Sequence, residues 1–201
     1  MRNEVINVNQ GEMLQAINRS EIDMQIATAH EFPRDIKQSQ KNILAMATID
    51  EDTAEDCLYV LHRTGGNSGG GNAIEGLSVR FAEIVADCWG NLRVAARIID
   101  NDGKTITAQG VCHDLETNVA ISVEVKRRIT NKYGQTFSED MQVVTGNAAC
   151  AIAFRNAVLK VVPKAITKSI VKEVKKMALG ASMDLQTTRQ KMLAYFQKLG
   201  V

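Results

Sequence analysis

The spacing of apolar residues changes along the chain from helical to alternating and back to helical. Residues 13–28 and 36–48 repeat apolar side chains every three or four positions, which predicts two helices separated by Pro33. Residues 57–63 form a short apolar run that is typical of a strand. We therefore expect two helices and one strand in the first third of the chain.

A glycine-rich segment, residues 65–72, is predicted to be a loop. It lacks the Gly-Lys-Ser/Thr ending with which a glycine-rich loop binds nucleotide phosphates beside a lysine and Mg²⁺. Two interpretations remain for it: a flexible linker, or a mobile flap over a bound strand. Helical spacing returns after it, and apolar side chains share one face over residues 77–88 before Trp89-Gly90 closes the element.

Three alternating segments come next, which predicts strands over residues 92–99, 105–115 and 119–128. Asn101-Asp102-Gly103 is expected to join the first two as a tight hairpin, because Asp-Gly tolerates the positive φ angles of such turns. In the third strand the apolar side chains face inward, so the outward face of the sheet should be basic. That face would carry Arg93, Arg97, Lys126 and Arg128, offset mainly by Glu124.

A long helix is predicted over residues 141–162, ended by Pro163. Its alanine-rich middle permits close packing against a sheet or a neighbouring subunit. Arg155 lies in the middle of an apolar arc at ~100° per residue, and a guanidinium there must be paired or must reach a cleft. Both possibilities stay open: an ion pair with Asp87 or Glu83, or a phosphate ligand at the floor of a groove.

Two further helices are predicted over residues 165–179 and 188–199, separated by a break at Gly180-Ala181-Ser182. Lysines fill one arc of the first of these helices, which is usual for a solvated face and also suits phosphate binding. Because the chain stops directly after the last helix, we expect it to be a piece of a longer protein.

These elements predict an α+β fold: a three-stranded antiparallel β-meander with a long packed helix (a βββα core) plus flanking helices. Four segments are expected. They are an N-terminal helical region with a short strand (1–64), a Gly-rich loop (65–73), the βββα core for DNA binding and oligomerisation (74–180), and a C-terminal helical segment (181–201).

Charge is distributed unevenly along the chain. Residues 1–119 carry 10 Lys/Arg and 18 Asp/Glu, a balance of −8, whereas residues 120–201 carry 14 and 5, a balance of +9. The overall charge of +1 hides this difference. A basic half of this kind is an electrostatic footprint for a polyanion such as nucleic acid.

The sequence lacks the usual signs of catalytic and metal-binding chemistry. The 4 cysteines are scattered without a Cys-x-x-Cys pair, and none of the 3 histidines has a metal-ligand partner at short spacing. We therefore expect no metal, no cofactor and no enzymatic activity, and reduced thiols in a cytosol. No apolar run approaches the ~20 residues of a membrane span, and the N-terminus has no signal-peptide pattern.

Asp114 and Glu116 support one enzymatic alternative. Their spacing could place two carboxylates on one face to bind Mg²⁺ in a nuclease, but such a site normally needs a third acidic or lysine partner. The alternative interpretation is that they are turn and strand-edge residues.

Several segments, taken in order, carry a resemblance to a known family. They are residues 21–29 (EIDMQIATA), 74–83 (IEGLSVRFAE), 89–92 (WGNL), 114–118 (DLETN) and 145–149 (TGNAA), continued through Arg155-Asn156 to Pro163. In these the chain resembles phage-type single-strand annealing recombinases, the group of RecT, Redβ and Erf, which shares a βββα core with the eukaryotic Rad annealing protein. Two features depart from the family pattern: the 65–72 loop is longer, and Leu77 stands where relatives often have proline.

The resemblance implies a protein that binds single-stranded DNA and anneals it to its complement without ATP during homologous recombination. It also implies a homo-oligomer, a ring or a helical filament, that holds single-stranded and annealed duplex DNA in a basic groove. The expected setting is phage-encoded and cytoplasmic in a bacterial host, beside a 5′→3′ exonuclease and the host single-strand binding protein. The candidate DNA-binding residues are Arg93, Arg97, Lys126, Arg127, Arg128, Lys132, Arg155 and Lys160. The alternative is an oligomeric phage structural or assembly protein without annealing activity.

Overall fold

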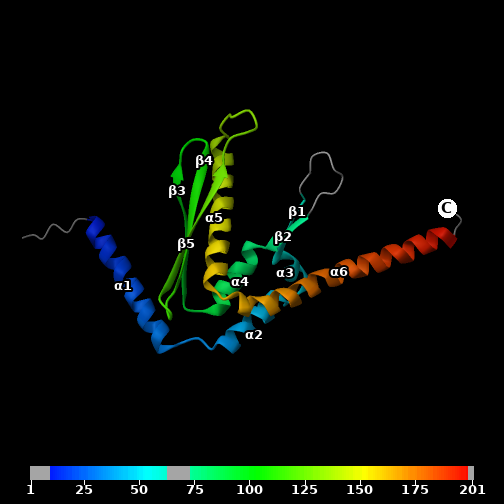
Figure 1. Ribbon diagram of the computed structural model, residues 1–201, viewed down its shortest axis with the longest axis horizontal. Helices are drawn as coiled ribbons and strands as arrows, with labels where there is room; N and C mark the ends of the chain where they lie inside the picture. The colour runs from blue at the N-terminus through cyan, green and yellow to red at the C-terminus, as the bar shows by residue number, and fades with distance from the viewer. Residues whose placement is uncertain (1–9, 63–72, 199–201) are drawn as a thin grey trace, which may run out of the picture.

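A computed structural model describes residues 10–62 and 73–198 of the chain (Figure 1). It confirms the α+β prediction: a three-stranded antiparallel sheet packs against one long helix, with further helices at one end. The helices are α1 (Gln10–Glu31), α2 (Ile36–Ala47), α3 (Glu51–Asp56), α4 (Val79–Trp89), α5 (Glu139–Val161) and α6 (Lys164–Lys198). The strands are β1 (Leu58–His62), β2 (Ala73–Leu77), β3 (Leu92–Asn101), β4 (Thr105–Asp114) and β5 (Val119–Arg128).

The main sheet has the order β3-β4-β5, and its register follows the predicted alternation. Val94 of β3 and Ile121 of β5 both pair with Cys112 of β4, so these three side chains lie on one face, the face that α5 covers. The register shifts between Ile98 and Asp100, which marks a bulge at the end of β3. The expected hairpin turn is formed, with Gly103 at a φ of +78°.

Helix α5 lies unusually close to β4. A stripe of small residues faces the sheet and is fully buried, and it consists of Gly146, Ala149, Ala153 and Ala157. A side chain at Gly110 of β4 would overlap the backbone of Ala153, so glycine is required where the helix crosses the strand. The alanine-rich middle of the helix therefore packs against the sheet of its own chain.

The largest apolar core lies where the C-terminal end of α5 and the adjoining end of the sheet meet α2, α4 and α6. Phe81, Ile43 and Val158 are fully buried there. Local capping fixes where two of these helices begin, because the Asp35 side chain accepts hydrogen bonds at the start of α2 and Ser78 caps α4. Pro163 follows the end of α5, as predicted.

The structure adds two elements that the sequence pattern did not predict. Residues 73–77 form strand β2, which pairs antiparallel with β1, so the two strands form a hairpin beside the main sheet. The predicted loop at residues 65–72 lies outside the described residues. Residues 51–56 form a short helix, α3, whose first turn is capped by Asp50.

The prediction of a helix break at Gly180-Ala181-Ser182 is wrong. Helix α6 is continuous from Lys164 to Lys198. Glycine in a helix interior costs about 1 kcal/mol relative to alanine, which weakens a helix without ending it, and alanine and serine are tolerated there.

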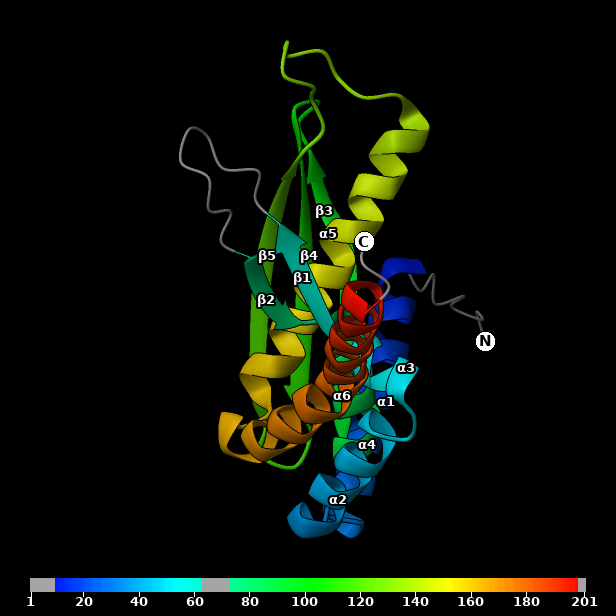
Figure 2. The same ribbon diagram turned by 90° about the vertical axis from the view of Figure 1, so that its right-hand side faces the viewer.

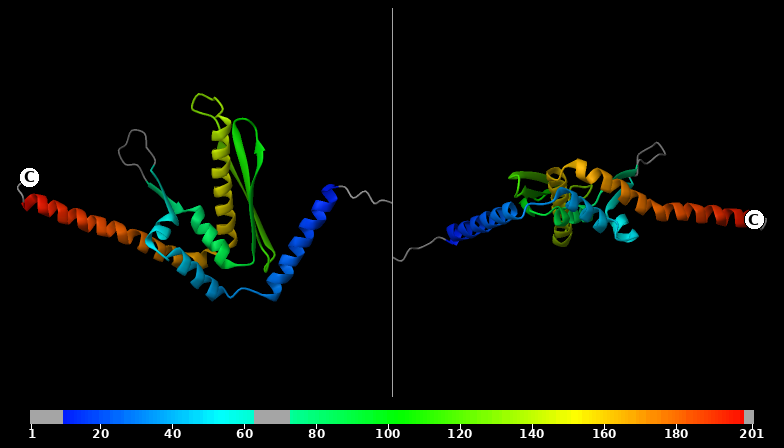
Figure 3. Two further views of the ribbon diagram at one scale, coloured as in Figure 1. Left: turned by 180° about the vertical axis from the view of Figure 1, so that it is seen from behind. Right: turned by 90° about the horizontal axis from the view of Figure 1, so that it is seen from below.

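Helices α1 and α6 extend away from the body in opposite directions (Figure 3). Helix α1 has two apolar stripes on opposite sides. Ile22, Ile26 and Ala29 are the less exposed stripe, whereas Met13, Ile17 and Met24 lie on the other side and are 58%, 45% and 64% exposed. Among the described residues, no helix is both long and apolar enough to cross a membrane.

Candidate nucleic-acid interface

The face of the main sheet opposite α5 carries four of the predicted DNA-binding residues. Arg93 and Arg97 of β3 pair with His113 and Gln109 of β4, and Lys126 and Arg128 of β5 pair with Thr107 and Thr105. Directly paired side chains share a face, so all four cations lie on the same side of the sheet. We call this surface the open face. Its basic character agrees with the predicted outward positions.

Two of the four cations of the open face have neutral hydrogen-bond partners. Arg93 Nη1 donates to Gln25 Oε1 of α1 at 2.9 Å, and Arg97 Nη2 lies 3.4 Å from Gln109 Oε1. Two exposed carboxylates share this face: Glu124 lies across β4 from Arg97, and Asp100 lies across β4 from Lys126. The four cations outnumber them, so the open face keeps a net positive charge.

Arg127 and Lys132 lie at the end of the sheet instead. Arg127 pairs with Ile106, so it points to the α5 side of β5, and it is exposed. Lys132 belongs to the segment between β5 and α5, where its Nζ lies 4.9 Å from the centre of the Tyr133 ring. Backbone bonds tie this segment to the β3–β4 turn, since the amide of Ile129 donates to the Lys104 carbonyl at 2.9 Å.

Arg155 and Lys160 lie on α5, away from the open face. The Arg155 guanidinium donates to the Leu77 carbonyl at 3.3 Å and to Asn156 Oδ1, and it stacks over the Tyr59 ring at 5.2 Å. Of the two possibilities left open for Arg155, the ion pair with Asp87 or Glu83 is not formed, and Glu83 pairs with Arg80 instead. Arg155 therefore links α5 to the β1–β2 hairpin, a contact that could not be predicted while β2 was missed. Lys160 is exposed.

The eight predicted residues thus form a group on the open face, a group at the sheet end and a pair on α5. Ion pairs among the described residues involve other cations. They are Arg34 with Asp114 and Glu116, Arg80 with Glu83, Lys175 with Glu75, and Lys176 with Glu173. Within residues 10–62 and 73–198, none of the eight predicted cations has a carboxylate partner within 4.0 Å.

Asp114 and Glu116, the carboxylates of the nuclease alternative, bind an arginine of the same chain. Arg34 Nη2 donates to Asp114 Oδ1 at 2.5 Å and Arg34 Nε donates to Glu116 Oε1 at 2.7 Å. Asn91 also donates to Glu116 Oε1, at 2.6 Å. The Arg34 side chain is only 6% exposed, so this is a buried network that joins the α1–α2 connection to the end of the sheet.

The network sets the acidity of both carboxyl groups. Burial by itself raises the pKa of Asp114, but the hydrogen bonds from Arg34 and from the amides of Thr117 and Glu116 outweigh it. The pKa of Asp114 therefore lies below its ordinary value. The pKa of Glu116 is lowered in the same way, since the bonds from Asn91 and Arg34 exceed the effect of burial.

Sequence reasoning missed Arg34 as the centre of this network. Its guanidinium lies 4.8 Å from the centre of the Trp89 ring, so it brings together the 89–92 and 114–118 segments that carry the family resemblance. The Trp-Gly-Asn and Asp-Leu-Glu-Thr-Asn patterns were the available signal, because polar residues that recur at strand ends need partners. The lone arginine after Pro33 gave no such signal.

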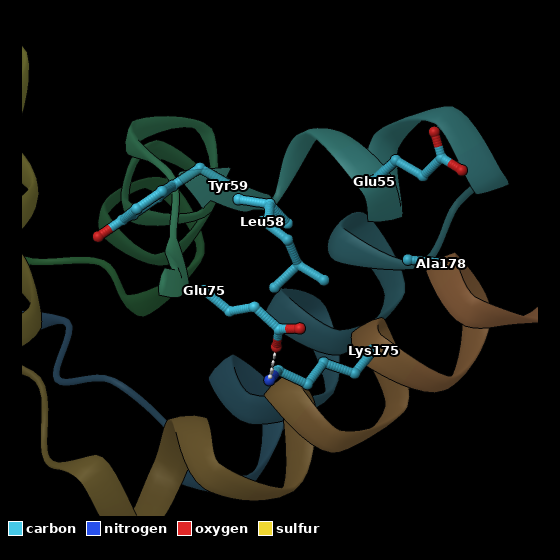
Figure 4. Close-up of a pocket in the computed structure, with 7 residues that line it drawn as sticks. Glu55, Leu58, Tyr59, Glu75, Lys175 and Ala178 are labelled. Carbon is cyan, nitrogen blue, oxygen red and sulfur yellow. Dashed lines mark hydrogen bonds and ion pairs between the residues drawn. The ribbon is translucent and has the colours of Figure 1, made fainter. Parts of the chain in front are cut away.

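The structure also has a pocket between the β1–β2 hairpin, α3 and α6 (Figure 4). Its volume is about 340 Å³, and its walls include Leu58 and Ala178. Glu55 and Glu75 stand at the rim, and Glu75 Oε2 pairs with Lys175 Nζ at 3.0 Å. With two carboxylates and one paired lysine, this pocket does not suit a phosphate. The ion pair instead links the surfaces of α6 and the hairpin.

Among the described residues, no three His, Cys, Asp or Glu side chains come close enough together to hold a metal ion. Comparison of the chain with protein-family models, with curated proteins and with solved structures finds no match.

Proposed function

We propose that this protein binds single-stranded DNA through phosphate contacts and anneals complementary strands without ATP. One observation carries the proposal. Four of the eight predicted DNA-binding residues share the open face, and none of the eight forms an ion pair with a carboxylate among the described residues. Unpaired surface cations that displace counterions from phosphates supply most of the affinity in non-specific nucleic-acid binding. Annealing also requires that the base edges stay free, which backbone contacts allow.

The competing functions have less support. A nuclease would need Asp114 and Glu116 for a metal ion, and both carboxylates accept hydrogen bonds from Arg34. An assembly protein without DNA binding would have no use for a basic open face. The exposed apolar stripe of α1 suits subunit contacts under either function, so we include a homo-oligomer, a ring or a helical filament, in the proposal.

The test is fluorescence anisotropy of a labelled oligonucleotide without ATP, followed by addition of its complement. We expect affinity to fall steeply from low salt to about 200 mM salt, and the complement to be annealed faster than in buffer. A matched pair of variants locates the site. Lys126→Ala/Arg128→Ala removes two charges from the open face, and Lys37→Ala/Lys41→Ala removes two exposed charges from α2.

Loss of two phosphate contacts should reduce the slope of log affinity against log salt by about 1.4 in the open-face variant. The α2 variant should keep the slope of the unaltered protein. Affinity that does not change with salt would contradict the proposal, and equal losses in both variants would remove the open face from it. Salt-dependent binding without faster annealing would support DNA binding and contradict the annealing part of the proposal.

A further inference from the structure

Tyr133 is the most exposed large apolar side chain in the described part of the protein, at 76%. It lies in the segment 129–138, which extends beyond the end of the sheet (Figure 2). We call this segment the tip loop. Lys132 Nζ lies 4.9 Å from the centre of this ring, and most of the ring surface remains exposed to solvent. Its position raises the question of what it contacts.

The tip loop is a defined structure. Thr130 and Thr136 form a β-bridge, and the Asn131 side chain accepts hydrogen bonds from the amides of Tyr133 and Gln135 at 2.9 and 3.1 Å. Gly134 supplies the positive φ, +82°, that the turn requires. The loop is also fixed to the β3–β4 turn, because Thr136 Oγ1 donates to the Gly103 carbonyl at 2.9 Å. The aromatic ring is therefore held on an ordered support.

Positive charge surrounds this support. Four exposed cations lie at this end of the sheet: Lys104, Arg127, Arg128 and Lys132. Arg127 and Arg128 lie there on opposite faces of β5. The nearby carboxylate of Asp102 accepts hydrogen bonds from the amides of Lys104 and Thr105, which lower its pKa and engage it within the turn. Glu139 and Asp140 begin α5 beyond the loop. Within residues 129–136, Lys132 is the one charged residue.

An exposed aromatic ring among cations is the arrangement that binds single-stranded nucleic acid, with the ring stacking on a base and the cations contacting the backbone. A duplex hides the faces of its bases, so stacking of this kind favours the single strand. We propose that Tyr133 stacks on an unpaired nucleobase while the cations at this end of the sheet bind the adjoining phosphates. This inference rests on the proposed function and adds a contact that distinguishes single strands from duplexes.

The experiment compares an oligothymidine with an abasic oligonucleotide of the same length, because the abasic strand keeps the phosphates and lacks the bases. Tyr133→Ala should weaken oligothymidine binding about tenfold and leave abasic binding within about twofold. Tyr133→Phe keeps the ring and should bind like the unaltered protein. Tyr195→Ala removes another exposed tyrosine, 63% exposed and on α6, and is the control. Circular dichroism confirms that each variant is folded.

The outcomes separate the two proposals. If the unaltered protein binds both oligonucleotides equally and with a steep salt dependence, phosphate binding stands and the stacking inference is wrong. Equal weakening of both oligonucleotides by Tyr133→Ala would also overturn stacking, as would no weakening of either. If the unaltered protein binds neither oligonucleotide at low salt, the proposed function fails and the inference fails with it.

Discussion

Gly110 of β4 lies directly against the carbonyl of Ala153 in α5, so that a single methyl group at Gly110 would overlap the helix backbone. Backbone atoms cannot move aside as the end of a long side chain can. The distance between the helix and the sheet therefore depends on this contact.

We predict that Gly110→Ala destabilises the protein by about 3 kcal/mol, because the helix must move away from the sheet. For a chain of this size the melting temperature should fall by about 6–12 °C. Gly146→Ala is the matched control: its new methyl group would lie 3.5 Å from Ile98 Cδ1, an ordinary contact. That variant should be unchanged or up to about 1 kcal/mol more stable, since alanine favours a helix. Similar melting temperatures for the two variants would show that the crossing is not tight.

Arg155 should act on stability more than on DNA binding, because its guanidinium is engaged by Leu77, Asn156 and Tyr59. We expect Arg155→Ala to lower the free energy of unfolding by about 2 kcal/mol and to leave DNA affinity per folded molecule unchanged. Lys160→Ala, an exposed cation on the same helix, should change stability by less than about 0.5 kcal/mol.

A double-mutant cycle with Tyr59→Leu tests the proposed partner of Arg155. The coupling between Arg155 and the Tyr59 ring should be about 0.5–2 kcal/mol, measured by urea unfolding. Weaker DNA binding by Arg155→Ala with an intact fold would instead identify Arg155 as a phosphate ligand.

The Arg34 network should make stability depend on pH in the acid range. The pKa values of Asp114 and Glu116 in the folded protein lie below their ordinary values of 3.8 and 4.5. Folding therefore gains stability from both groups at neutral pH and loses it as the pH falls below about 4 and through the lowered values. Urea unfolding between about pH 6 and pH 3 measures the loss. Asp114→Asn should be less stable near neutrality and should show a flatter pH dependence, whereas parallel curves would contradict the prediction.

The outer stripe of α1 should support assembly. Met13→Gln, Ile17→Gln and Met24→Gln together keep helix propensity but remove the exposed apolar surface, so we expect the variant to form smaller particles in light scattering. Gln15→Ala and Asn18→Ala, which change exposed polar residues of the same helix, should leave the particle size unchanged. Unaltered protein that stays at 22.0 kDa with and without complementary oligonucleotides would disprove the assembly proposal.

The main sheet and its long helix could be predicted because their signals are local. Alternation in residues 92–99 and 119–128, the Asp-Gly turn and Pro163 each act within a few residues. Strand β2 could not be predicted in the same way, since Ala73–Leu77 is short and acquires its strand conformation by pairing with β1 across a long connection. The contact of Arg155 with the hairpin could not be predicted for the same reason.

The predicted outward positions on β3 and β5 followed from a period of two residues, which fixes the face of every side chain once the register is known. Arg127 shows the limit of the charge pattern: it stands between Lys126 and Arg128 in sequence and on the opposite face in space. Arg34 shows another limit of sequence patterns. A buried ion pair between distant segments produces no periodic pattern in the sequence, so it could not be predicted.

The continuity of α6 has a consequence for how copies of the protein can be spaced. Thirty-five residues at 1.5 Å each make a rod of about 50 Å, longer than the diameter of a small domain. Its far end carries Met192, Tyr195 and Phe196, which are 60%, 63% and 50% exposed. In the proposed oligomer, a neighbour bound at this end would lie away from the three-stranded sheet. The rod would then act as a spacer that leaves the open face accessible to a long strand of DNA.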